Sequence, residues 1–209
     1  MNEIERIQQR TRSYWYCDGI AELIGGIAMM LVGFPMVAAA RTGAEMISTI
    51  ALMAMILLFP ATARIVGLLK DRITHKRTGY VQYPRPAMTK RRKLAIFSVL
   101  VGVAAAMLVA LWGGDYTLNG TVGKALLLGV GAGMAVAFVL RAKRLQIPRL
   151  YIVAVVAGAA TLLSGLSDFG FVEGVGWLLA TIGSASVITG GVALITYLSR
   201  HPRVPQETP

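Results

Sequence analysis

The sequence predicts an all-α membrane protein: a polytopic bundle of six transmembrane helices forming a single domain over residues 1–209. Two observations indicate this class. Hydrophobic residues make up 56% of the chain, and the mean hydropathy is +0.64, a composition that is rare for a soluble domain of this length. The apolar residues also occur in long blocks, and the basic residues gather between alternate blocks.

Each apolar block is long enough for a membrane-spanning helix. A helix needs about 20 apolar residues to cross roughly 30 Å of hydrocarbon. Only helices suit these blocks, because unpaired backbone groups in lipid are costly and the alternating pattern of barrel strands is absent. The predicted spans cover residues 18–40, 46–69, 94–112, 122–140, 150–166 and 175–198.

The basic residues predict the orientation of the bundle. With the N-terminus inside, 19 of the 21 Lys and Arg residues fall in inner segments, and only Arg41 and Lys124 fall outside. Short loops rich in Lys and Arg stay in the cytoplasm. We therefore expect both termini to be cytoplasmic, in a bacterial inner membrane. The net charge of +11 then faces anionic lipid head groups and not nucleic acid.

The basic cytoplasmic loop over residues 70–93 has an uneven composition. Its end, TKRRK, is a plain positive stop, whereas RTGYVQYPRP also carries a glycine, two tyrosines and two prolines. The pattern allows an ordered loop that binds lipid phosphate, a docking surface for a partner protein, or a site for a phosphate-bearing small molecule. The candidate residues for lipid or partner binding are Arg72, Arg77, Tyr80, Tyr83 and Arg85.

Three charged residues at the start of the first span and the end of the second are candidates for a buried ion pair. Asp18 and Glu22 share one helix face, and Arg64 lies at a depth similar to that of Glu22. A lone charge at this depth is costly, so we predict that Glu22 pairs with Arg64. The alternative is that each side chain extends separately to the interface. Cys17, the only cysteine, precludes an intramolecular disulfide and is interpreted as structural.

Two stretches, YWYCDGIAELIGG at 14–26 and RITHKRTGYV at 72–81, resemble an uncharacterised family of small bacterial multi-spanning membrane proteins. Members of that family carry a YWYxDG-type N-terminus and a basic RTGYV loop. The sequence departs from this pattern at His75 and Lys76, where Tyr-Pro is expected. The resemblance covers about a tenth of the chain and implies no catalytic role.

The sequence carries no recognised catalytic motif. A His-Glu-x-x-His helix, a phosphate-binding Walker loop and a Gly-x-Ser-x-Gly elbow are all missing. Neither His75 nor His201 has partner ligands at metal-binding spacing. We therefore expect no metal, no cofactor and no catalytic residue. An enzyme acting on lipid head groups would need Asp18, Glu22, Arg77 and Tyr80 to converge in one cleft.

Two functions of different classes remain. The first is a non-enzymatic interaction or accessory protein whose basic cytoplasmic face binds anionic lipid or a membrane protein partner. The second is a small transporter or channel that works as an oligomer, which Pro35 and Pro60 within the first two spans would suit as hinges. The deep polar positions that such a path would use are only Thr161, Ser164, Ser184, Ser186 and Thr189.

Small residues recur at helical spacing in the later spans. Gly129 and Gly133 form a GxxxG pair, and the last span repeats small residues at Gly176, Ala180, Ser184, Ser186 and Gly190. Such spacing lets two helix backbones approach closely. The stripes predict either packing inside the bundle or an interface with a second copy or another membrane subunit.

Overall fold

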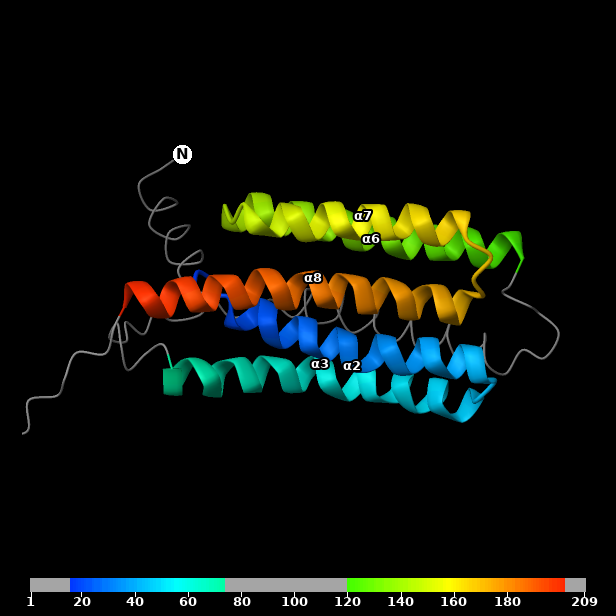
Figure 1. Ribbon diagram of the computed structural model, residues 1–209, viewed down its shortest axis with the longest axis horizontal. Coiled ribbons are helices and arrows are strands. Elements are labelled where there is room, and N and C mark those ends of the chain that lie inside the picture. Colours follow the sequence, from blue (N-terminus) through cyan, green and yellow to red (C-terminus); the bar gives the residue numbers. More distant parts are fainter. Residues whose placement is uncertain (1–15, 74–119, 202–209) are drawn as a thin grey trace, which may run out of the picture.

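The computed structural model describes residues 16–73 and 120–201, and the regular structure in these ranges is entirely helical (Figure 1). The predicted third span, 94–112, lies outside the described residues. The described helices are α2 (Ile20–Thr42), α3 (Glu45–Ile73), α6 (Thr121–Leu145), α7 (Arg149–Leu166) and α8 (Phe171–Arg200).

Four helices in the described ranges are long and apolar enough to cross a membrane. They are α2, the Gly123–Leu145 part of α6, α7 and α8, with mean hydropathies between 1.7 and 2.1. Helix α3 covers the predicted second span, but the apolar stretch found among its described residues, Met46–Met55, is shorter. The predicted helical class is therefore confirmed.

The helices lie roughly along one common direction (Figure 1). The pairs α2–α3, α2–α8, α6–α7 and α7–α8 are antiparallel, whereas α6 and α8, which also touch, run in the same direction (Figure 1). Helix α2 packs against α3 and α8, and α7 packs against α8 and α6. At one end of the bundle α2 and α7 begin, and α3, α6 and α8 end (Figure 1). We call this the basic end, because most of the described Lys and Arg residues lie there. The other is the opposite end.

Helix α2, with the glycine that precedes it, packs against α8 through glycines that repeat every seven residues in both segments. Gly26 lies against Gly183, and a Cβ atom added to Gly26 would be 2.6 Å from the Gly183 carbonyl oxygen. The same relation joins Gly33 to Gly176 and Gly19 to Gly190. A seven-residue repeat returns to nearly the same helix face, so the two backbones touch along most of their length.

Many large apolar side chains point away from the packed core. The exposed set includes Leu31, Phe34, Leu57, Val155, Leu162 and Ile195, distributed over α2, α3, α7 and α8. The buried core between the helices includes Val32, Met36, Leu127, Val175 and Leu178. In water such an apolar exterior would promote association. In hydrocarbon it is the expected surface of a membrane helix.

Candidate functional site

The turn before α2 brings Asp18 into the bundle. The Ile20 backbone N–H donates to Asp18 Oδ1 at 3.3 Å, and Gly19 adopts the left-handed conformation with φ of 72°. The Gly19 backbone also lies against the Gly190 carbonyl, with no room for a Cβ atom. Position 19 therefore requires glycine for two independent reasons, its φ angle and its contact with α8.

Asp18 forms a buried ion pair with Lys70 in the last turn of α3. The Lys70 Nζ atom is 2.9 Å from Asp18 Oδ2, and each side chain is only 2% exposed. Two charges at this burial are tolerated because each compensates the other. The pair ties the N-terminal turn to the end of α3.

Glu22 forms a second ion pair, with Arg149 at the start of α7. The Arg149 Nε and Nη2 atoms donate to the two carboxylate oxygens of Glu22 at 2.8 and 3.2 Å. Arg149 Nη1 donates to the Cys17 carbonyl oxygen at 3.3 Å, and Nη2 also donates to the Tyr16 carbonyl. The planar guanidinium suits this fork, because it presents several donors in fixed directions.

The pairing corrects the partner predicted for Glu22. The sequence suggested Arg64, but the structure pairs Glu22 with Arg149, and the Arg64 side chain is exposed. Similar depth on adjacent helices does not place two side chains on facing sides. Arg64 points out of the bundle, where its long side chain can extend to the interface.

Together, Asp18, Glu22, Lys70 and Arg149 form what we call the ion-pair clasp. The clasp joins the N-terminal turn, α2, α3 and α7 at the basic end. Burial raises the pKa of the neighbouring Cys17 thiol, the nearby Asp18 carboxylate raises it further, and Lys70 and Arg149 act in the opposite direction. A raised thiol pKa leaves less thiolate, which is the reactive form of cysteine.

Exposed cations lie at the same end of the bundle as the clasp. Arg72, Arg141, Lys143, Arg144 and Arg200 are all exposed at the basic end, and the Arg141 guanidinium lies 5.0 Å above the Tyr16 ring. We call these five residues the basic surface. At the opposite end, Arg41 pairs with Glu173 at 3.0 Å and Lys124 with Asp168 at 2.9 Å. Among the described residues, exposed cations are therefore more numerous at the basic end than at the opposite end.

Of the five candidate residues for lipid or partner binding, Arg72 lies within the described residues and the other four lie outside them. Arg72 is exposed in the last turn of α3 and belongs to the basic surface. Arg77, Tyr80, Tyr83 and Arg85 lie outside the described residues, so their role stays a prediction. The structure therefore brings Asp18 and Glu22 together at the basic end, with Arg72 on the surface of the same end.

Three of the five deep polar side chains are hydrogen-bonded within their own helices. Thr161, Ser184 and Thr189 donate to the carbonyl oxygens of Ala157, Ala180 and Ala185, four residues earlier. Ser164 and Ser186 are buried. Hydroxyl groups used in this way add no free donor to the interior of the bundle.

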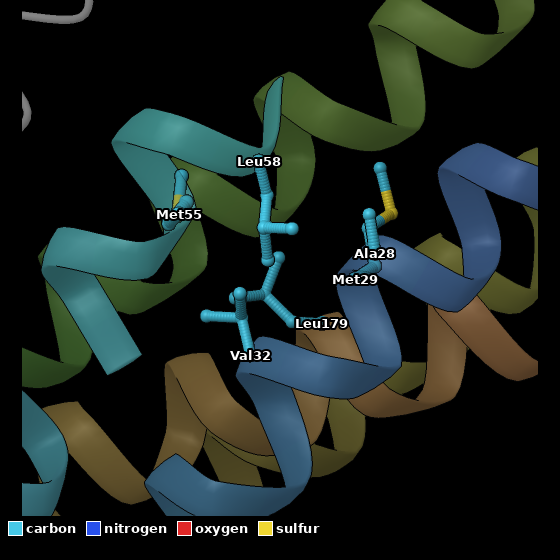
Figure 2. Close-up of a pocket in the computed structure, with 6 residues that line it drawn as sticks. All are labelled: Ala28, Met29, Val32, Met55, Leu58 and Leu179. Atoms are coloured by element: carbon cyan, nitrogen blue, oxygen red, sulfur yellow. The ribbon is translucent and has the colours of Figure 1, made fainter. Parts of the chain in front are cut away.

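A small apolar cavity lies between α2, α3 and α8 (Figure 2). Its volume is about 10 Å³, and it is lined by Ala28, Met29, Val32, Met55, Leu58 and Leu179. A water needs at least a volume of this size and two or more polar partners. The lining supplies no polar side chain, so this cavity is a packing defect and not a binding site.

Two features of the site were missed by sequence reasoning. Lys70 was assigned to the basic loop and Arg149 to a positive inner segment, so neither was expected to be buried or half-buried. The glycines at 19, 26 and 33, and at 176, 183 and 190, carry a detectable signal. A search for seven-residue glycine repeats in two different spans would have predicted the contact between α2 and α8.

In comparisons with known proteins, no family model, no curated protein and no solved structure matches this chain. The resemblance carried by the YWYCDG and RTGYV stretches therefore stays a prediction.

Proposed function

We propose that the protein is a non-enzymatic multi-pass membrane protein that holds a basic cytoplasmic surface against anionic lipid head groups. The observation that carries this proposal is the difference in charge between the two ends of the bundle. Five exposed cations form the basic surface, whereas Arg41 and Lys124 at the opposite end are each paired with a carboxylate.

The positive-inside rule then assigns the basic end to the cytoplasm, in a bacterial inner membrane with both termini inside. The proposed topology has six spans. Helix α3 ends at the basic end and α6 begins at the opposite end (Figure 1), so the chain between them has to pass from one end to the other. A crossing by the apolar segment 94–112 meets this requirement.

The expected strength of lipid binding follows from the number of cations. Each Lys or Arg near an anionic membrane surface contributes about 1 kcal/mol. Neutralising Arg141, Lys143 and Arg144 together should therefore weaken the free energy of binding to anionic lipid by about 3 kcal/mol, which is roughly a hundredfold in affinity for that lipid. The ion-pair clasp fixes the starts of α2 and α7 and the end of α3 relative to one another, and Arg72 of the basic surface lies on that end of α3.

The same observations favour an interaction protein over a transporter. A transport path needs polar or ionisable groups near the middle of the membrane. The deep hydroxyl groups of Thr161, Ser184 and Thr189 are instead bonded to their own helices, and the cavity beside Met55 has no polar lining. A protein partner on the basic surface is the remaining alternative.

The test is native mass spectrometry of the protein from nanodiscs that contain a neutral lipid and a fraction of anionic lipid. We expect the wild type to retain anionic lipid preferentially, and the triple variant Arg141→Gln, Lys143→Gln, Arg144→Gln to lose this preference. The matched control is Lys124→Gln at the opposite end, which should retain it. Equal retention of anionic lipid by the wild type and the triple variant would refute lipid binding at this surface.

The orientation is tested separately with single cysteines in a Cys17→Ser background. A membrane-impermeant maleimide added to intact bacterial spheroplasts should label Thr42→Cys, which is at the opposite end, and should label Lys143→Cys only after lysis. The reverse labelling pattern would place the basic end outside and contradict the proposal.

A further inference from the structure

A cluster of charged and aromatic side chains lies at the opposite end of the bundle, where α2 ends and α8 begins (Figure 1). Arg41 is in the last turn of α2, and Glu173 is in the first turn of α8. The guanidinium carbon of Arg41 lies 5.5 Å from the centre of the Trp177 ring. Phe169, just before α8, stacks against Trp177 with ring centres 6.4 Å apart. We call these four residues the Arg41 cluster.

The Arg41 guanidinium is held on one side and accessible on the other. Its Nε atom donates to Glu173 Oε1 at 3.0 Å, and the Trp177 ring supports the cation. The Arg41 side chain is nevertheless 58% exposed. Within residues 16–73 and 120–201, its Nη1 and Nη2 atoms form no hydrogen bond. The guanidinium therefore keeps two donor groups, in the fixed fork that matches a phosphate group.

The charge of the Arg41 cluster indicates which head group it can accept. One guanidinium and one carboxylate give a net charge of zero. Arg41 still has donors for an anion, and Glu173 has its second oxygen, Oε2, for a cation. A head group with only a negative charge is repelled by Glu173, whereas a head group with a phosphate and an ammonium group matches both side chains. The cluster therefore favours a zwitterion, unlike the basic surface.

The surface of α2 below Arg41 indicates that this zwitterion belongs to a lipid. Leu31, Phe34 and Ala38 are exposed and follow the helical spacing that places them on the same face as Arg41. Leu31 lies about 15 Å from Arg41 along the helix, which is half of a hydrocarbon core of roughly 30 Å. One acyl chain of one leaflet can follow this apolar stripe. Trp177 beside Arg41 suits the head-group level, where tryptophan is enriched.

We propose that the Arg41 cluster binds a zwitterionic phospholipid of the phosphatidylethanolamine class. Its phosphate lies on Arg41, its ammonium group lies on Glu173, and an acyl chain lies along Leu31, Phe34 and Ala38. The inference requires that α2 and α8 cross a membrane. It is independent of which end is cytoplasmic and of lipid binding at the basic surface.

Photocrosslinking in vesicles tests the proposal. The vesicles contain equal amounts of phosphatidylethanolamine and phosphatidylglycerol, with a trace of either lipid carrying a diazirine on an acyl chain. Proteolysis and mass spectrometry map the label, and labelling of the exposed residues Val155 and Leu162 on α7 serves as the reference for ordinary lipid contact. In the wild type, the Leu31–Arg41 stripe should be labelled several times more strongly by phosphatidylethanolamine than by phosphatidylglycerol.

Two variants separate the cluster from charge in general. Arg41→Gln should lower labelling of the stripe by phosphatidylethanolamine about fivefold, the value of one cation at a lipid surface. The matched control is Lys124→Gln at the same end, where the Lys124 and Asp168 pair is more exposed than Glu173, and labelling should not change. The triple variant of the basic surface should also keep the wild-type preference, so that failure at one end is distinguished from failure at the other.

Glu173→Gln provides a result that a purely structural ion pair would not give. The substitution leaves the cluster with a net positive charge, so the preference of the stripe should reverse towards phosphatidylglycerol. Three outcomes would overturn the inference: equal labelling of the stripe by both lipids in the wild type, wild-type labelling in Arg41→Gln, or an unchanged preference in Glu173→Gln. Thermal unfolding checks that the variants are folded, and Glu173→Gln decides if Arg41→Gln is not.

Discussion

The Asp18 carboxylate and the Lys70 ammonium group lie 2.9 Å apart with both side chains almost completely buried. They connect the turn that begins α2 to the last turn of α3. Removing one member of such a pair leaves the other as an uncompensated buried charge, whereas neutralising both does not. The stability of the basic end should therefore depend on the pair as a unit.

Replacing Lys70 by Met should lower the free energy of unfolding by about 3–5 kcal/mol, because the Asp18 charge stays buried without its cation. Thermal unfolding in detergent measures the effect. Exposed Arg72 provides the control, and Arg72→Ala should change the stability by less than about 0.5 kcal/mol. The double variant Asp18→Asn, Lys70→Met should regain more than half of the loss; a double variant as unstable as Lys70→Met would show that charge compensation is not the cause.

Replacing Arg149 by Lys should destabilise the protein almost as much as Arg149→Ala. Lysine keeps the charge but cannot reach both Glu22 oxygens and the carbonyls of Tyr16 and Cys17 at once. We expect a loss of about 3 kcal/mol, at the low end for buried pairs because Arg149 is 22% exposed. The measurement is again thermal unfolding, with exposed Arg144→Lys as the control. Wild-type stability of Arg149→Lys would mean that charge alone is sufficient.

Gly26 and Gly25 are adjacent but should respond oppositely to alanine. A Cβ atom on Gly26 would lie 2.6 Å from the Gly183 carbonyl oxygen, whereas one on Gly25 meets nothing within 4 Å. We expect Gly26→Ala to destabilise the protein by about 1–3 kcal/mol through overpacking. Gly25→Ala should be neutral or stabilising by up to about 1 kcal/mol. Similar unfolding temperatures for the two variants would contradict the close contact of α2 and α8.

The thiol of Cys17 should react slowly with iodoacetamide at pH 8. Burial, and then the Asp18 carboxylate, raise its pKa above the ordinary value of 9.0, and alkylation requires the thiolate. The rate in folded protein should therefore rise with a midpoint above pH 9.0, while the unfolded protein should react with a lower midpoint. The raised pKa also makes the free energy of unfolding depend on pH. Because the thiol pKa is higher in the folded protein than in the unfolded protein, the stabilising contribution of the protonated thiol is fully present below the unfolded pKa. It is lost as the pH rises through the folded pKa. Equal midpoints would contradict this environment.

The charged residues illustrate how far the sequence could define the site. Asp18 and Glu22 stood out because an acid inside an apolar span needs a partner. Their partners could not be identified from the sequence, because Arg149 is 127 residues from Glu22 and several cations lay at a similar depth. Arg64 fitted the depth and the neighbouring helix, but its direction around the helix axis depends on how α2 and α3 are rotated against each other.

The sequence by itself determined the helical class and the distribution of charge along the chain. Both depend on local properties, namely the length of an apolar block and the Lys and Arg residues beside it. Only the tertiary structure decided that Gly26 faces Gly183 and that Lys70 and Arg149 enter the clasp. Such pairs depend on the register and rotation of helices that are distant in the chain. Packing fixes these relations by summing many weak contacts, so no local pattern specifies them.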